Sequence, residues 1–434
     1  MSQLLTMRTM TLLLALSLTA HNAVAEGLET AWLEALANDQ IIQARQSHVL
    51  AAEANLGAAQ ASRLPTVHAS AGVTLFDSTP AFDFSAAGIP GVLPLFGDDT
   101  LEMANAQVTL PLYTGGTIKH GIEAAQAMLN AQKYQSAVST QQLKLAVAQH
   151  YINVLRAGSA LHVAQTNVTS LSAHLGDVED MWNTGAVARS DYLAAAVSLA
   201  NAQQLRLQAG NGVELANASY NRALGRDLGA PVDLNENLPG IDPLLDISSL
   251  EALFSTALQY RDEIGGLGAA AEAYQQQAES VRGKGRPQLA VTGGYMLLEN
   301  EFLNSDDYWM VGIGVQWNLF DGGHIRKKAN ALAFKSDAAR LEQNNLRSLI
   351  ELQVRQSWLR LNETRERKHL TERAVEQAEE NLRVVRDRYR NGEGTNTEVL
   401  DAEAMRSLSR SNYDNANFDA KLALYELARG VGRL

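Results

Sequence analysis

The chain of 434 residues contains no cysteine. Disulfide bonds, thiolate metal sites and a lipid on an N-terminal cysteine are therefore excluded. Proline is scarce as well: the chain has nine prolines and contains long proline-free stretches rich in Ala, Gln and Leu. Because proline interrupts helices, this composition favours long helices over several compact cores.

A long apolar run is also missing after the N-terminal segment. A membrane-spanning helix needs roughly 20 apolar residues, so any membrane-spanning part of the mature chain must be β-structure. There is no surplus of basic residues either, since the formal net charge is -12. Phosphate contacts need clustered Lys and Arg, so this charge disfavours nucleic acid as a partner.

Residues 1–25 predict a signal peptide. Arg8 supplies the basic start, residues 10–20 a short apolar stretch, and residues 23–25 (Ala-Val-Ala) a cleavage site of small residues. The apolar stretch is too short for a membrane anchor. We expect the mature chain to begin at Glu26 and to be exported.

The sequence contains an internal duplication. Residues 110–226 align without a gap onto residues 317–433, which places Gly115-Gly116 on Gly322-Gly323. We assign the first repeat to residues 26–230 and the second to residues 231–434. Each repeat reads helix, strand, loop, strand, very long helix, turn, helix, and the first repeat has extra residues between its strands.

Each repeat contains a predicted β-hairpin, at residues 65–113 and 287–320. Apolar side chains alternate with polar or small ones in all four strands. Each strand has about the 9–11 residues that cross a bilayer. Aromatic residues gather at the strand ends, as expected at a membrane interface: Phe76, Tyr113, Tyr308, Trp309, Trp317 and Phe320. Taken alone, the alternation would equally suit two hairpins packed on a soluble core.

Four strands are too few for a closed membrane barrel. An open sheet edge in lipid leaves backbone groups unpaired, and the smallest membrane barrels have about eight strands. The chain must then associate with copies of itself, giving eight strands from two chains or twelve from three. A wide aqueous lumen needs well above eight strands, so a conduit favours twelve.

Two very long helices are predicted at residues 117–183 and 324–390, each roughly 100 Å long. Their far ends carry apolar residues at spacings of three and four, which is typical of a coiled-coil seam: Val168, Leu171, Leu175, Val178 and Trp182 in the first repeat, and Val375, Ala378, Leu382, Val385 and Tyr389 in the second. The partner helices are predicted at residues 189–226 and 395–432. Each repeat begins with a further helix, at residues 28–61 and 249–282.

The junction motifs, together with this order of parts, carry a resemblance to a known family. Residues 110–116 (LPLYTGG) and 317–323 (WNLFDGG) stand at strand-to-helix junctions, and residues 389–392 (YRNG) and 398–401 (EVLD) at a helix tip. The mature chain resembles the TolC-like outer-membrane efflux proteins. The resemblance implies a mainly α protein with membrane β-structure: a homotrimer in which four strands per protomer form a twelve-stranded outer-membrane β-barrel, continuous with a periplasmic α-helical barrel.

The same resemblance implies partners and a location. The partners are a periplasmic adaptor protein and an inner-membrane transporter, beside the lipid of the outer membrane. The location is the outer membrane of a Gram-negative bacterium, with the helices extending into the periplasm.

The resemblance also implies a periplasmic gate at the helix tips. Tyr389 matches the family's tip aromatic, Glu398 and Asp401 match acidic residues that ring the lumen, and Ser190 and Asp191 match the polar pair of the first tip. Gly394 stands where relatives have a gate arginine, which leaves Arg189 or Arg390 as cation partners.

The residues themselves give two readings of the acidic pair. Glu398 and Asp401 share one helix face, and threefold symmetry would gather six carboxylates that favour cations. The same acids also suit the first turn of a helix, where they complement the helix dipole.

No catalytic constellation is found. The nine histidines are scattered, no HExxH pattern occurs, and the glycine pairs lack the P-loop lysine. We predict no enzyme, no cofactor and no metal site. The predicted function is a passive outer-membrane exit duct for tripartite efflux or type I secretion, with the loop at residues 81–95 at its outer mouth. The alternative is a soluble periplasmic coiled-coil adaptor or scaffold, which would not need four strands with an apolar face.

Overall fold

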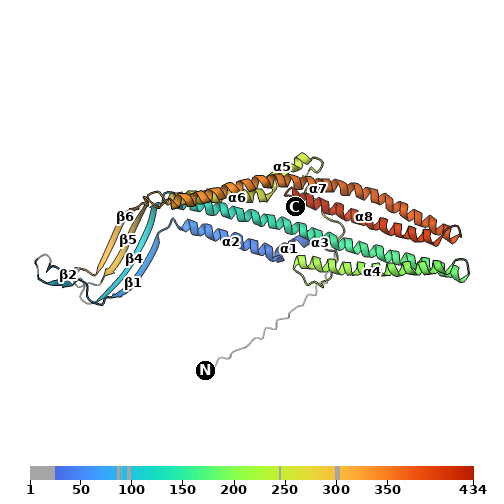
Figure 1. Ribbon diagram of the computed structural model, residues 1–434, viewed down its shortest axis with the longest axis horizontal. Coiled ribbons are helices and arrows are strands. Elements are labelled where there is room, and N and C mark those ends of the chain that lie inside the picture. Colours follow the sequence, from blue (N-terminus) through green and yellow to red (C-terminus); the bar gives the residue numbers. More distant parts are fainter. Residues whose placement is uncertain (1–24, 86–87, 89, 95–98, 244–245, 299–303) are drawn as a thin grey trace, which may run out of the picture.

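The computed structural model describes residues 25–85, 88, 90–94, 99–243, 246–298 and 304–434. The predicted signal peptide, except Ala25, and parts of the loop at residues 81–95 lie outside the described residues. The molecule is elongated, with the β-strands at one end and two helix tips at the other (Figure 1).

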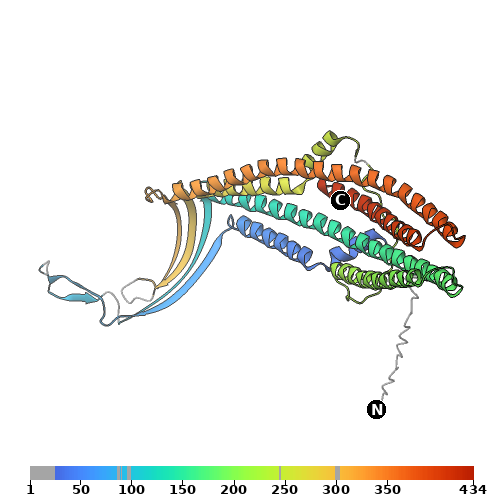
Figure 2. The same ribbon diagram turned by 45° about the vertical axis from the view of Figure 1, so that its right-hand side comes forward.

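One four-stranded sheet joins the two repeats. It is made of β1 (Thr66–Leu75), β4 (Thr100–Tyr113), β5 (Gln288–Leu298) and β6 (Asp307–Gln316). The strand order is β1-β4-β5-β6 and every pair is antiparallel, so the repeats meet along β4 and β5. In Figure 2 the strands bend together as one curved sheet. The second hairpin was predicted to extend to residue 320, but β6 ends at Gln316, which pairs with the first residue of β5.

The strand register places the apolar residues of all four strands on one face. Val67 pairs with Val108, and Val291 pairs with both Leu110 and Ile313. Because side chains alternate along a strand, the residues between these belong to the opposite face. The apolar face is open: 73% of Val67, 68% of Ile313 and 86% of Val311 are exposed.

The extra residues of the first repeat form a small hairpin. β2 (Ala81–Asp83) pairs with β3 (Val92–Pro94) in a separate two-stranded sheet. This hairpin lies beyond the far end of the main sheet (Figure 1).

Two helices run from the sheet to the tips without a break. They are α3 (Thr117–Asn183) and α7 (His324–Arg390), each of 67 residues. The returning helices α4 (Arg189–Leu224) and α8 (Asn396–Gly430) pack alongside them. None of the helices in the described ranges is both long and apolar enough to cross a membrane.

The opening helix of each repeat was predicted as continuous, and this is wrong in both repeats. The first is broken into α1 (Leu28–Asn38) and α2 (Gln40–Ala61), and the second into α5 (Leu250–Tyr260) and α6 (Asp262–Gly283). At the first break the Asp39 carboxylate accepts a hydrogen bond of 2.8 Å from the Ile42 backbone N–H and so caps a new helix. At the second break the buried Arg261 guanidinium donates to the Gly430 carbonyl at 2.9 Å.

The end of each returning helix packs against the helix break of its own repeat: α4 against the first break and α8 against the second. The Asn38 side chain donates to the Leu224 carbonyl at 3.0 Å. At Gly432 a Cβ would lie 2.5 Å from the Tyr260 carbonyl oxygen, so only glycine fits there. Two apolar cores form beside these contacts, one around Tyr151 and Tyr220 and the other around Leu253 and Ile350. The middle of the molecule is therefore fixed, and the tips extend beyond it.

Candidate functional site

The two helix tips lie side by side at the end of the molecule opposite the sheet (Figures 1 and 2). Left-handed glycines, Gly185 and Gly392, follow α3 and α7 and allow the chain to reverse. One apolar cluster holds both hairpins together, and its members come from all four helices: Val178, Ala195, Leu382, Val385, Tyr389, Val399 and Ala402. The packing of each tip therefore depends on side chains from the other.

Tyr389 is an internal residue of this cluster. Only 4% of it is exposed, and its ring packs edge-on against His174 with 5.4 Å between centroids. Its phenol oxygen is buried with no hydrogen-bond partner among the described residues. Burial raises the pKa of the phenol, followed in effect by the charges of Asp191 and Asp177. Within the chain, Tyr389 contributes through packing.

Glu398 closes a capping box at the start of α8. Its carboxylate accepts from the Thr395 backbone N–H at 2.9 Å, and the Thr395 hydroxyl accepts from the Glu398 N–H at 3.2 Å. The Arg388 guanidinium lies 3.9 Å from the same carboxylate. The helix-start role considered for this acid is therefore present, while the carboxylate keeps part of its surface in water. Asp401 is exposed one turn further along.

The three polar residues at the start of α4 differ in their exposure to solvent. Arg189 and Ser190 are exposed, whereas Asp191 is partly buried. The Asp191 backbone carbonyl accepts a hydrogen bond of 3.0 Å from the Asn396 side chain. That bond joins the start of α4 to the start of α8.

The second candidate cation, Arg390, is held by a residue of its own chain. Its guanidinium donates to the Asp177 carboxylate of α3 at 2.9 and 3.1 Å. At Gly394, where the family resemblance led us to expect an arginine, a Cβ would lie 3.2 Å from both the Tyr389 backbone nitrogen and a Glu398 carboxylate oxygen. A side chain at position 394 would therefore crowd the capping box.

A buried ionic network, not foreseen from the sequence, adjoins the apolar cluster, since Arg386 follows Val385 and Glu403 follows Ala402. Glu403 is 1% exposed, pairs with Arg386, and accepts from Arg406 at 3.2 Å. The Ser170 hydroxyl donates to Glu403 at 2.8 Å and accepts from Arg386 at 2.6 Å. The network ties α3, α7 and α8 together. One signal was available in the sequence: Glu403 follows Val399 by four residues and so falls on the apolar stripe of α8.

His174 completes the tip. It is 3% exposed, and its Nε2 lies 2.7 Å from the carbonyl oxygen of the Asn396 side chain. Burial lowers the pKa of the imidazole below its ordinary 6.5, and Arg386 adds to the lowering. The hydrogen bond with Asn396 and the carboxylates of Glu403 and Asp177 oppose this, but burial is the larger effect.

The packing at the tips should therefore loosen in acid. Local unfolding returns His174 to water, where its pKa is about 6.5, so the unfolded tip binds the proton more strongly than the packed tip. The stability of the packed tip should be steady above pH 6.5 and fall as the pH drops below it. Hydrogen–deuterium exchange of peptides from the tips, corrected for intrinsic rates, would measure this. In a His174→Gln variant, exchange at the tips should no longer accelerate below pH 6.5. If it still did, another titrating group would be responsible for the pH dependence.

In the part of the chain that the structure describes, no three His, Asp or Glu side chains are grouped to hold a metal ion.

Comparison with known proteins identifies the family. The sequence profile described as "Outer membrane efflux protein" matches residues 33–226 and 253–433. The outer membrane efflux protein BepC of Brucella suis biovar 1 (strain 1330) is 20% identical over 422 residues, which cover 96% of this chain and 88% of that protein.

Solved structures show the same fold. The outer-membrane channel OprN superposes with a TM-score of 0.80 at 19% identity, covering 94% of this chain and 90% of that chain. The outer membrane protein VceC of Vibrio cholerae gives 0.80 at 16% identity, covering 94% and 96%. These relatives are channel and efflux proteins, which supports a role other than catalysis. The protein therefore has the TolC-like fold, resides in the outer membrane and belongs to the outer membrane efflux protein family.

Proposed function

We propose that three copies of this chain form a passive exit duct through the outer membrane. The observation that carries the proposal is the four-stranded sheet, because its apolar side chains share one face that no other described element covers. Such a face suits contact with lipid, while the opposite face suits a water-filled lumen. Four strands from each of three copies would close a barrel of twelve.

Closure would follow from the two edges of the sheet. In the described chain β1 pairs only with β4, and β6 only with β5. Unpaired backbone groups are costly in hydrocarbon, so β6 of one copy would pair with β1 of the next. Large exposed apolar side chains on the helices would be covered in the same assembly: Leu193, Val197, Leu205 and Leu215 on α4, and Phe334, Leu341, Leu352 and Leu370 on α7.

The helices would carry the duct across the periplasm. At 1.5 Å per residue, the 67 residues of α3 or α7 span about 100 Å. A periplasmic adaptor and an inner-membrane transporter would meet the tips and supply cargo and energy. The description of the family as efflux proteins favours small toxic compounds over secreted polypeptides as cargo.

The experiment that tests the duct combines two measurements on one preparation. Native mass spectrometry of the detergent-purified protein should give a trimer, and planar bilayers should show small, cation-selective, mostly closed channels. A water-soluble species without channel activity would contradict the duct and make a soluble adaptor or scaffold the leading function.

We place the gate of this duct at the helix tips. Glu398 and Asp401 would supply the carboxylates of the constriction, and Tyr389 would hold the tips closed through packing. Arg390 would contribute by tying α7 to α3 within the protomer. Ser190, Asp191 and Arg189 would form the rim contributed by the first repeat.

Removing the two gate charges without removing the cap tests this placement. Glutamine at position 398 can still close a capping box, so Glu398→Gln with Asp401→Asn should leave α8 folded. The double variant should lose much of its preference for cations, because six carboxylates would leave the constriction. Reversal potentials in a KCl gradient measure the preference. The Glu380→Gln variant, which changes an exposed carboxylate on α7, is the control; equal selectivity in all three proteins would assign Glu398 and Asp401 to the helix start alone.

A further inference from the structure

The face of the sheet opposite the apolar one carries a diagonal row of methionines. Met103 on β4 pairs with Leu298, Met296 on β5 pairs with Asn105 and Tyr308, and Met310 on β6 pairs with Gly294. Met103 and Met296 are therefore diagonal neighbours, as are Met296 and Met310. Nine methionines occur in the sequence and three of them precede Glu26, so this row contains half of the rest.

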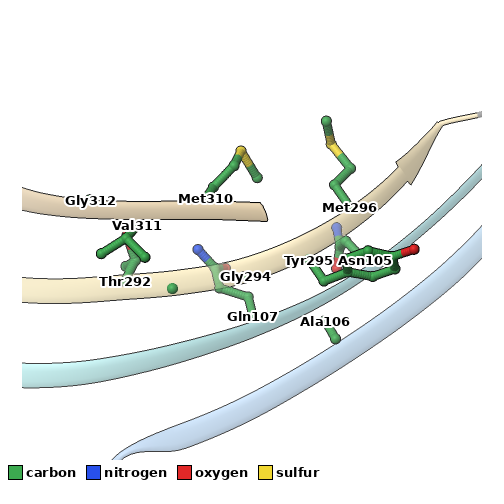
Figure 3. Close-up of a pocket in the computed structure, with 11 residues that line it drawn as sticks. Asn105, Ala106, Gln107, Thr292, Gly294, Tyr295, Met296, Met310, Val311 and Gly312 are labelled. Atoms are coloured by element: carbon green, nitrogen blue, oxygen red, sulfur yellow. The ribbon is translucent and has the colours of Figure 1, made fainter. Parts of the chain in front are cut away.

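Two members of the row, Met296 and Met310, line an open depression of about 440 Å³. Figure 3 shows Met296 and Met310 rising from neighbouring strands on the same side of the sheet, beside the amide side chains of Asn105 and Gln107. The space exists because Gly294 and Gly312, on the same face, have no side chains. Met103 and Met310 are 46% and 50% exposed, so their thioethers are accessible from this side.

The surroundings of the row favour cations. Neither residues 64–118 nor residues 287–325 contain a single Lys or Arg, whereas the same two segments contain ten Asp and Glu. Within the strands of the main sheet, Glu102 and Asp307 fall on the apolar face, so a cation beside the row is favoured by the absence of any Lys or Arg rather than by a ring of acids. Anionic or neutral cargo would gain nothing from this distribution.

The side chains are spaced so that two thioethers can share one ion. Diagonal neighbours on antiparallel strands lie about 7–8 Å apart, within reach of long side chains. Thioether sulfur is a soft ligand that selects ions such as Cu(I), whereas hard cations prefer oxygen. Purely apolar contact would not require sulfur, since leucine fills a similar volume.

We propose that Met103, Met296 and Met310 form a transit site for soft monovalent metal cations, of the Cu(I) and Ag(I) class, in the outer section of the duct. The inference rests on the proposed function, because the methionine face lines the lumen in the closed barrel. Three copies of the row would give the lumen nine thioethers. An ion would pass from one to the next without being held by a closed set of ligands.

Silver(I) is the probe for the test, in nitrate salts to avoid precipitation. Isothermal titration of the detergent-purified oligomer should show silver binding that weakens at least tenfold in the triple variant M103L/M296L/M310L. In planar bilayers, silver should reduce the potassium current of the unaltered protein and have little effect on the triple variant. The control is Met128→Leu with Met181→Leu and Met405→Leu, which removes the three helical methionines and should leave silver binding unchanged.

The outcomes separate this site from the duct itself. Potassium current in the triple variant shows that the barrel is intact. If that variant binds silver as tightly as the unaltered protein, the methionine site is wrong. If binding disappears only with His68→Gln, which changes the imidazole opposite Gln107 on the same face, the ligand is histidine and the proposal is overturned. Absence of potassium current in the unaltered protein would instead contradict the proposed function.

Discussion

Replacing Glu403 by alanine is expected to open the helix tips. The substitution leaves the Arg386 and Arg406 guanidinium groups facing each other without a counter-charge. Breaking a fully buried pair costs about 3–5 kcal/mol, and we expect about 2–3 kcal/mol here because both arginines keep partial contact with water. Amides at the tips should then exchange about 30- to 140-fold faster with deuterium, and the channels should spend more time open.

Two further variants make this prediction specific. The exposed ion pair of Arg383 with Glu380 lies on α7, the helix that carries Arg386. Because exposed ion pairs contribute little to stability, Glu380→Ala should change deuterium exchange at the tips very little. A variant that replaces Glu403, Arg386 and Arg406 together by apolar residues of similar size should exchange more slowly than Glu403→Ala, since no unpaired charge is left buried. If Glu403→Ala exchanged like the unaltered protein, the network would not hold the tips.

The second large effect is expected at Tyr389, where removing the whole ring should destabilise the tips and removing only the hydroxyl should not. Tyr389→Ala removes a ring that is 4% exposed from the middle of the tip cluster, and core truncations of this kind cost about 3–5 kcal/mol. Tyr389→Phe removes only a hydroxyl that has no partner among the described residues. Since burying an unpaired hydroxyl is unfavourable, the phenylalanine variant should close as well as tyrosine or better.

Channel recordings and exchange at the tips measure both variants. The alanine variant should be leaky and its tip amides poorly protected, while the phenylalanine variant should match the unaltered protein. Leakage from Tyr389→Phe equal to that from Tyr389→Ala would mean that the hydroxyl makes an essential bond to a neighbouring protomer. Packing of the Tyr389 ring alone would then not explain closure of the tips.

Much of the architecture could be predicted from the sequence because the signals are long and periodic. The strands show an uninterrupted alternation, and α3 and α7 contain no proline over 67 residues. The helix breaks at Asp39 and Arg261 were missed for two different reasons. Asp39 is a readable cap, but the apolar pattern continues across it; Arg261 breaks its helix through a contact with Gly430, which lies 169 residues away.

The tip was harder to predict because its chemistry is tertiary. His174 on α3 meets Asn396 on α8, and Glu403 on α8 meets Arg386 on α7; only the place of Glu403 on an apolar stripe could be noticed in the sequence. Sequence spacing places Glu398 and Asp401 on one face, yet it does not reveal that the Glu398 carboxylate is shared with the Thr395 N–H. Local patterns fix the ends of helices, and only packing decides which polar side chains become buried.

The two strand-to-helix junctions differ in a way that has a mechanical consequence. Gly115 is confined: a Cβ there would lie 2.4 Å from the Gly283 carbonyl oxygen, and Arg286 donates to its carbonyl at 3.0 Å. Gly322 has open space around it. A side chain at position 115 would force the start of α3 away from the end of α6, whereas one at position 322 would meet only the strain of a left-handed backbone. The base of the first long helix is thus held against α6, and the glycine turn at the base of the second is not.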